Sequence, residues 1–315
     1  MDRRAFVSGV TLALLAAPVA ADAQQAGKPV RIGWLSATSP DRGPEQQRPI
    51  VERHLRQSGW TPHFELRYAE GNLDRLAAMA EELASARLAV IVAPDTQGAL
   101  AAKKAMATIP IVMSSADPVG AGLVASLAKP GGNITGVSAA FDDSFAGKWV
   151  ELLRDIGAGS SIAVVWNPAS PTVAGRISVI ERAAANHGFR LHRLEIRSAA
   201  DVDAVVQALA RTSVGGLIFD ADLTMIPYLP RIVEATRRHR VPSVFAFAPQ
   251  AAAGGLLAYG PSLTDIYRLI GVYVDRILRG AKPSELPVEQ MRKYDLIINL
   301  KTAKALGLTI PQSLL

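Results

Sequence analysis

The chemically versatile side chains of this sequence follow predicted strands, at the points where the strands end. Hydroxyls can hold a carboxylate, carboxylates can hold an amine, and aromatic rings can stack on an apolar body. The pattern therefore predicts a binding site for a small polar molecule. Its candidate members are Ser36, Thr38, Asp95, Thr96, Ser114, Ser115, Asp117, Asp142, Asn167, Asp220, Asp222 and Phe245, with Phe247 as an alternative to the last.

Each polar member of this set has a second interpretation. Ser, Thr, Asp and Asn are also the preferred N-caps of helices, and helices are expected directly after these strands. Asp142 with Asp143 and Asp220 with Asp222 form carboxylate pairs. Without the context of a glycosidase, such pairs are cap or ligand residues rather than an acid–base couple.

Sequence patterns for catalysis or metal binding are missing. The five histidines show neither H-x-x-x-H nor H-x-H spacing, and neither G-x-S-x-G nor the G-x-x-x-x-G-K-[ST] phosphate loop occurs. The sequence has no cysteine, which excludes disulfides, thiolate metal sites, a thiol nucleophile and a lipoprotein anchor. We therefore expect no catalytic residue, no metal and no cofactor.

One motif favours a different activity. Residues 120–125 read Gly-Ala-Gly-Leu-Val-Ala, a G-x-G-x-x-A pattern expected to follow a strand and open a helix. This pattern is typical of dinucleotide binding, although it begins six residues after Ser114 and lies in the fourth βα unit. A glycine-rich helix start that packs closely on its neighbour is the simpler interpretation. An exported NAD(P)-dependent oxidoreductase is kept as the alternative.

The basic residues do not form a nucleic-acid signature. The net charge is +6, and the densest basic run covers residues 237–240, just before Val241-Pro242. Cations suit the negative end of a helix, which is expected to end there. No zinc-finger, basic-zipper or RNA-recognition pattern accompanies the run. We expect no nucleic-acid partner and a monomeric protein.

The first 23 residues have the pattern of a signal peptide. Arg3-Arg4 precede an apolar stretch from Ala5 to Ala20, and Ala21-Asp22-Ala23 form an A-x-A cleavage site. The paired arginines also resemble a twin-arginine signal, so a twin-arginine-like or an ordinary secretory route is expected. Either route predicts a periplasmic protein.

Apolar, β-branched runs alternate with helical patterns from Val30 onward. Leu76, Met79 and Leu83 illustrate the helical spacing within residues 74–86. Strands separated by helices of this length form parallel βαβ units, so the predicted fold class is α/β with doubly wound parallel sheets. The predicted strands are 30–36, 63–68, 88–93, 109–114, 134–138, 162–167, 189–196, 215–220, 241–247, 256–259 and 294–299.

The strands form two similar series. Ile109-Pro110-Ile111-Val112 and Val241-Pro242-Ser243-Val244 occupy the fourth-strand position of each half. Both third strands also run into an acidic tip. We predict two lobes joined by a multi-strand hinge, because late segments return to complete each lobe. The first lobe is expected to comprise residues 29–139 and 255–285, and the second residues 140–254 and 286–315.

Several ordered motifs resemble those of the ABC-transporter substrate-binding family of the tryptophan/tyrosine-type uptake systems. The resemblance runs over nearly the whole mature chain. The motifs are Ile109–Val112, Asp117-Pro118-Val119-Gly120, Gly122-Leu123-Val124, Lys129-Pro130-Gly131-Gly132-Asn133-Ile134-Thr135-Gly136, Trp166-Asn167-Pro168, Tyr259-Gly260-Pro261 and Ile298-Asn299-Leu300-Lys301-Thr302-Ala303.

This resemblance implies a type I periplasmic binding fold whose two lobes hinge around a cleft. It implies delivery of a small ligand to an ABC permease at the membrane, and it makes Thr96 a ligand contact. Family members usually carry Gly-Thr at the third-strand tip, whereas this chain carries Asp95-Thr96. Because Asp95 adds a charge, the family's preference for aromatic amino acids need not carry over.

Taken together, the sequence predicts an exported, non-enzymatic solute-binding protein. Its expected ligand is small and polar or zwitterionic, with an aromatic amino acid as one such molecule. A periplasmic sensor module shares the fold and stays open as a further alternative.

Overall fold

The β-branched runs of the first half form a six-stranded sheet in the computed structural model, which describes residues 28–40, 46–139, 143–170, 173–211 and 214–315. Every described strand pair in this sheet is parallel. The predicted signal peptide and Asp142 lie outside the described residues. The strands, in spatial order, are β11 (Glu289–Gln290), β5 (Ile134–Ser138), β4 (Ile111–Ser115), β3 (Val90–Ala93), β1 (Lys28–Ser36) and β2 (Trp60–Tyr68).

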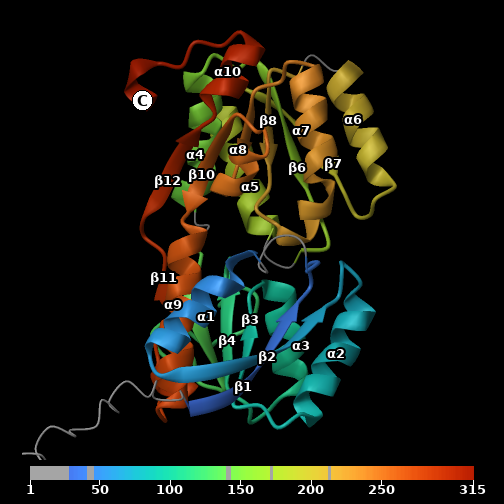
Figure 1. The fold of residues 1–315 in the computed structure, drawn as a ribbon. Helices are drawn as coiled ribbons and strands as arrows, with labels where there is room; N and C mark the ends of the chain where they lie inside the picture. Colours follow the sequence, from blue (N-terminus) through green and yellow to red (C-terminus); the bar gives the residue numbers. More distant parts are fainter. Residues whose placement is uncertain (1–27, 41–45, 140–142, 171–172, 212–213) are drawn as a thin grey trace, which may run out of the picture.

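Helices cover both faces of this first sheet, because alternate side chains of a strand point to opposite faces. Ile32 and Trp34 of β1 pack with helices α1 (Arg48–Gln57) and α9 (Leu263–Leu278). Leu35 of the same strand packs on the other face, with α2 (Leu73–Ser85) and α3 (Thr96–Ala105). The first lobe is therefore a doubly wound three-layer unit, as the sequence predicts (Figure 1).

The second half repeats the design, with one antiparallel strand at the edge. Its sheet has the order β12-β10-β9-β8-β6-β7, and β12 runs antiparallel to β10. The strands are β6 (Ser161–Trp166), β7 (Arg190–Glu195), β8 (Gly216–Phe219), β9 (Ser243–Phe245), β10 (Leu257–Pro261) and β12 (Tyr294–Ile298). The helices are α4 (Asp143–Asp155), α5 (Val173–Asn186), α6 (Asp201–Arg211), α7 (Leu229–Arg238), α8 (Ala248–Ala252) and α10 (Leu300–Leu306), with the 3-10 helix η2 (Leu223–Tyr228) before α7.

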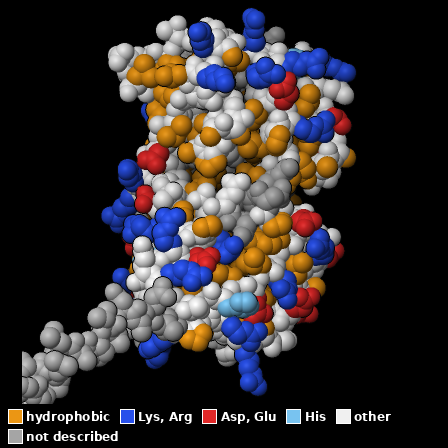
Figure 2. Space-filling model, viewed as in Figure 1, with side chains coloured by type: hydrophobic (Ala, Val, Ile, Leu, Met, Phe, Trp, Pro, Cys, Tyr) orange, Lys and Arg blue, Asp and Glu red, His pale blue; other side chains and the backbone are white. Residues whose placement is uncertain are grey.

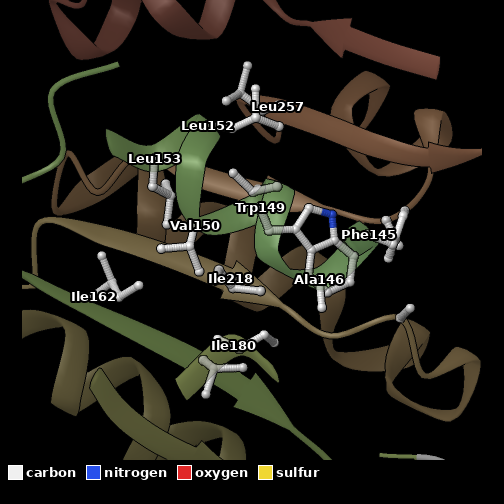
Figure 3. Close-up of a cluster of buried hydrophobic side chains, with 14 of the residues drawn as sticks. Phe145, Ala146, Trp149, Val150, Leu152, Leu153, Ile162, Ile180, Ile218 and Leu257 are labelled. Atoms are coloured by element: carbon white, nitrogen blue, oxygen red, sulfur yellow. The ribbon is translucent and has the colours of Figure 1, made fainter. Parts of the chain in front are cut away.

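Trp149 of α4 lies at the centre of the larger core of the second lobe. It is fully buried among side chains from α4, α5 and the sheet, including Phe145, Ile180 and Leu257 (Figure 3). Its indole Nε1 donates a 2.9 Å hydrogen bond to the carbonyl oxygen of Tyr259. The ring is thus packed and its polar atom satisfied, which fixes α4 against β10.

The chain passes between the lobes after β5, after β10 and after β11. The passages after β10 and β11 lie on the same side of the molecule (Figure 1), and more than one passage is what the predicted multi-strand hinge requires. The division of the chain differs from the predicted one in two short segments. Strand β10 pairs with β9 in the second sheet, and β11 pairs with β5 in the first. The C-terminal segment thereby adds one edge strand to each sheet.

Gly260 of the Tyr-Gly-Pro motif lies at the second of these passages. A Cβ at this position would overlap the carbonyl oxygen of Ala246, so only glycine allows β10 to approach the end of β9 so closely. This steric requirement accounts for the glycine in the motif.

The segment between β4 and β5 corrects an expectation. Residues 116–133 form bends and turns, and no helix begins at Gly120. The side chain of Asp117 accepts a 2.8 Å hydrogen bond from the Gly120 N–H and closes one of these turns. Both interpretations of residues 120–125 assumed a helix start, and both were wrong on that point.

Each predicted strand is confirmed to within a few residues. Among the described strands, only the short β11 was not predicted. The basic run ends α7 as expected, with Arg237 and Arg238 in the last turn. None of the helices among the described residues is both long and apolar enough to cross a membrane.

Candidate functional site

A cavity that is partly open to solvent lies between the carboxyl ends of the two sheets. This is where doubly wound folds bind ligands, because loops and helix N-termini converge there. The first lobe contributes Pro94, Asp95, Thr96, Gln97, Ser114, Ser115, Ala116 and Ala139 to its lining. The second lobe contributes Ser170, Arg176, Ala221, Asp222, Thr224 and Phe247, and helix α9 contributes Leu263, Ile266 and Tyr267.

Asp95 ends β3 and caps helix α3. Its Oδ1 accepts a 2.7 Å hydrogen bond from the Gly98 N–H, and its Oδ2 accepts bonds from the Ser36 hydroxyl at 2.7 Å and the Ala37 N–H at 3.0 Å. Burial raises the pKa of this carboxyl; the hydrogen bonds oppose that effect, and the charge of Asp222 adds to it. Asp95 therefore brings an acidic side chain into the cavity wall while tying the end of β1 to α3.

Hydroxyl groups line the first-lobe side of the cavity. The Thr96 hydroxyl lies 3.0 Å from the Ser115 hydroxyl, and either can donate in that pair. Ser114, the neighbour of Ser115 on β4, also lines the cavity and is half-buried. Because a hydroxyl both donates and accepts, this group can hydrogen-bond either a carboxylate or an amine.

A buried ion pair forms the opposite wall. Arg176 of α5 donates from Nε to Asp220 Oδ1 at 2.5 Å and from Nη2 to Asp220 Oδ2 at 2.8 Å. The side chains are only 3% and 0% exposed, so the pair is shielded from water. Burial alone would lower the pKa of Arg176, but the carboxylates of Asp220 and Asp222 raise it, so the guanidinium stays charged.

Asp222 lies beside this pair at the start of η2. Its Oδ1 accepts hydrogen bonds from the Thr224 N–H at 2.8 Å and the Thr224 hydroxyl at 2.7 Å. Burial raises the pKa of the Asp222 carboxyl; hydrogen bonds from Thr224 and Ser170 oppose this, whereas the charge of Asp220 adds to it. Asp222 is therefore a desolvated carboxylate in the cavity wall, and the Thr224 and Ser170 groups that donate to it carry no charge.

Apolar and aromatic side chains complete the cavity. Phe247 comes from the second lobe, and Ile266 and Tyr267 come from α9. Tyr267 is held from behind by Trp34, whose ring stacks on it at 6.3 Å between centroids. These rigid rings offer a surface for the apolar body of a ligand.

Five of the predicted site residues line the cavity: Asp95, Thr96, Ser114, Ser115 and Asp222. Four others lie behind them. Ser36 and Thr38 hydrogen-bond each other at 2.8 Å and support Asp95, and Asp220 holds Arg176. Asn167 donates to the Thr224 hydroxyl at 3.1 Å, so it supports the partner of Asp222.

Two predicted residues lie away from the cavity. Asp117 is exposed and closes the turn to Gly120. Phe245 is fully buried in the second-lobe core, where it packs on Phe219 at 5.7 Å between ring centroids. Phe247 follows the end of β9, packs with the other core of this lobe, and reaches the cavity instead.

Arg176 is the main lining residue that the sequence did not predict. It lies inside a helix rather than after a strand, so the search for polar strand ends passed over it. A basic residue among the buried positions of α5, which include Val173, Ile177 and Ile180, was the available signal. Ser170, Thr224 and Tyr267 were missed for the same reason, because none of them directly ends a strand.

In the described part of the chain, no three His, Cys, Asp or Glu side chains gather as a metal site. Basic side chains are also dispersed. On the face in Figure 2, the described Lys and Arg residues are scattered over both lobes among acidic ones.

Two six-stranded α/β lobes, hinged beside a cleft with a mixed polar and aromatic lining, define a protein of the periplasmic binding fold. A solved periplasmic solute-binding protein from Actinobacillus succinogenes has the same fold, with a TM-score of 0.60 and 14% identity over 87% of this chain and 99% of that one.

A profile of the ABC transporter substrate binding protein family matches residues 53–315, and the chain belongs to this family. The Tyrosine-binding protein of Clostridioides difficile is 25% identical over 242 residues, which is 76% of this chain and 69% of that protein. A solved ABC domain from Streptococcus pneumonia, in complex with L-Trp, is 25% identical, covers 90% of this chain and 97% of its own, and has a TM-score of 0.82. The family consists of solute-binding proteins, not enzymes.

Proposed function

We propose that this protein captures a small, amino-acid-like molecule with an aromatic or apolar body in the cavity between its lobes. The observation that carries the proposal is the shared lining, in which Thr96 and Ser115 of one lobe face Arg176 and Asp222 of the other. A ligand there would be desolvated on both sides, which strengthens each polar contact.

The chemistry of the walls matches the parts of such a ligand. The hydroxyls of Thr96 and Ser115 can donate to a carboxylate, and the N-terminal end of α3 favours negative charge. Asp222 can accept from an ammonium group. Phe247 and Tyr267 can pack against the apolar body. The relatives that bind tyrosine and L-Trp support this ligand class.

The proposed cycle ends at a membrane permease. Because the lining comes from both lobes, ligand binding favours the form in which the lobes are closed together. The closed form would then deliver its ligand to the permease of an ABC importer. The pattern of residues 1–23 supports export to the periplasm before this cycle begins.

Calorimetry on protein that has been unfolded, dialysed and refolded tests the proposal. We expect saturable binding of L-tryptophan or L-tyrosine. Native protein should also release a ligand of this class when denatured and analysed by mass spectrometry. Co-purification of a sugar, together with no binding of either amino acid, would contradict the proposed ligand class.

Thr96→Val sharpens the same experiment, because valine keeps the shape of the side chain and removes its hydroxyl. Loss of a hydrogen bond to a buried ligand should weaken affinity by about 5- to 150-fold. Thermal stability should change little, since Asp95 and not Thr96 is the N-cap of α3. Unchanged affinity with a lowered melting temperature would assign Thr96 a purely structural role.

A further inference from the structure

The charges around the cavity do not balance. Asp95, Asp220 and Asp222 bring three carboxylates to its wall or directly behind it, and Arg176 is the one basic side chain in the described lining. Arg176 engages Asp220 through two hydrogen bonds, so that pair is close to neutral. Asp95 and Asp222 are the other acidic side chains of the lining, and they lie on opposite lobes.

The groups that donate to Asp95 and Asp222 in these contacts are neutral. Backbone N–H groups and hydroxyls partly offset the cost of burying a carboxylate, but they leave its full charge in place. The charge of Asp222 is also one of the causes that raise the pKa of Asp95, so the ionised forms of the two carboxyl groups disfavour each other. Closing the lobes around these charges is therefore unfavourable unless something positive lies between them.

The net charge of the ligand therefore changes how favourable it is to close the lobes around it. A zwitterion adds no net charge and leaves two negative charges enclosed. A singly charged ammonium ion reduces the imbalance by one. An anion increases it, and the guanidinium that could have offset it is already paired with Asp220.

We propose that Asp222 and Asp95 make the cavity selective for a net positive ligand, a small ammonium ion with an aromatic or apolar body, in which a carboxylate group is dispensable. The inference rests on the proposed function and narrows its ligand class. Asp222 accepts from the ammonium group directly, at the lone pairs not used by Thr224 and Ser170. Asp95, with three hydrogen bonds already accepted, acts through its charge.

Three probes that share one ring system test this selectivity by calorimetry. L-Tryptophan carries both charged groups, tryptamine only the amine, and indole-3-propionate only the carboxylate. We expect tryptamine to bind about tenfold or more tightly than L-tryptophan, because it adds one unit of positive charge. Indole-3-propionate should show no measurable binding.

Asp222→Asn provides the second arm, since it keeps the size of the side chain and removes the charge. It should weaken tryptamine by about 10- to 100-fold and reduce the preference for tryptamine over L-tryptophan. Asp95→Asn should also reduce the preference for tryptamine over L-tryptophan. Asp74→Asn, an exposed acidic residue in the first turn of α2, is the matched control and should leave both affinities unchanged.

The outcomes separate the inference from the function on which it rests. If L-tryptophan binds at least as tightly as tryptamine, or Asp222→Asn leaves the preference intact, the inference is wrong and the proposed function stands. If indole-3-propionate is the tightest of the three probes, the inference is likewise wrong. If none of the three probes binds, the proposed aromatic ligand class fails, and the inference fails with it.

Discussion

The third strands of the two lobes, β3 and β8, end at corresponding positions, and each is followed by an aspartate. The two aspartates differ in the groups that hold their carboxyl oxygens. In the first lobe, β3 leads into Asp95, whose carboxylate is held by backbone N–H groups and a hydroxyl. In the second lobe, β8 leads into Asp220, whose carboxylate is held by the guanidinium of Arg176. The repeated topology thus places a carboxylate at each tip, while local partners decide whether its charge persists.

Because of this difference, Asp95 and Asp220 have different roles in the cleft. The first-lobe carboxyl group, Asp95, fixes a loop and a helix N-terminus, and no basic side chain donates to it in the described contacts. The second-lobe carboxylate positions a cation, and the next acidic residue, Asp222, takes the place at the cavity surface. A doubled fold can therefore carry an asymmetric site without any change in strand order.

Asp220→Ala should produce the largest effect, because it leaves the guanidinium of Arg176 buried without its partner. We expect a loss of about 3–5 kcal/mol in the free energy of unfolding, measured by urea denaturation. Asp203→Ala is the matched control, since Asp203 pairs with Arg231 on the surface of the same lobe, with a side chain 67% exposed. Equal losses in the two variants would contradict the structural role given to Asp220.

Asp95→Ala should have the next largest effect. It removes the N-cap of α3 and leaves the Ser36 hydroxyl and the Ala37 N–H without their acceptor, for a loss of about 1–3 kcal/mol. Asp95→Asn should lose less, because its amide oxygen can still accept one of these bonds. If the alanine and asparagine variants are as stable as the parent chain, Asp95 does not tie β1 to α3.

Asp222 and Asp275 should give opposite pH dependences of stability. Burial raises the pKa of Asp222, which faces Asp95, Asp220 and Arg176. Burial also raises that of Asp275 in α9, but hydrogen bonds from Arg279 and Trp60 outweigh it and lower its pKa overall. A carboxyl with a raised pKa holds its proton more tightly when folded, so its contribution to stability falls as pH rises through that pKa. The contribution of Asp275 is present at neutral pH and is lost as pH falls below the ordinary value of 3.8.

Urea midpoints between about pH 3 and about pH 7 measure this contrast. Relative to the parent chain, Asp222→Asn should gain stability as pH rises from the ordinary aspartate pKa. Asp275→Asn should be less stable at neutral pH and approach the parent chain at the acidic end. Parallel curves for the two variants would contradict the assignments.

The smallest expected effect concerns the connections to the fifth strand of each half, β5 and β10. Residues 116–133 link β4 to β5 without a helix, whereas α8 lies between β9 and β10 in the second lobe. Because a dinucleotide site needs a helix N-terminus after its glycines, NAD or NADP should cause no saturable stabilisation. A ligand at 100 times its dissociation constant would add about 2.7 kcal/mol, which a thermal melt detects readily. A saturable shift of that size would restore the dinucleotide interpretation.

The class of fold and the location of the candidate site could both be predicted from the sequence. Apolar β-branched runs alternate with amphipathic helices, and this pattern has few parallel solutions, so most strands were predicted to within a few residues. The same logic placed Asp95, Thr96, Ser114, Ser115 and Asp222 at strand ends, where the carboxyl edges of parallel strands meet. The strand predictions were confirmed because they depend on local periodicity and on a general rule for parallel sheets. The five residues line the cavity, and their role as ligand contacts stays a prediction.

Tertiary packing determines which of these residues contact one another and which acidic side chains of the cleft have a basic partner. Ser36 and Thr38 lie at a strand end like Thr96, but the approach of Asp95 turns them into its supports. Arg176 is distant from Asp220 in sequence and becomes its partner because α5 packs over the end of β8. The two-residue strand β11 was missed because a segment that short has no periodicity, and its pairing with β5 comes from the return of the chain to the first lobe. Charge balance in the cleft is a property of such long-range pairings, and so it is not contained in any local pattern.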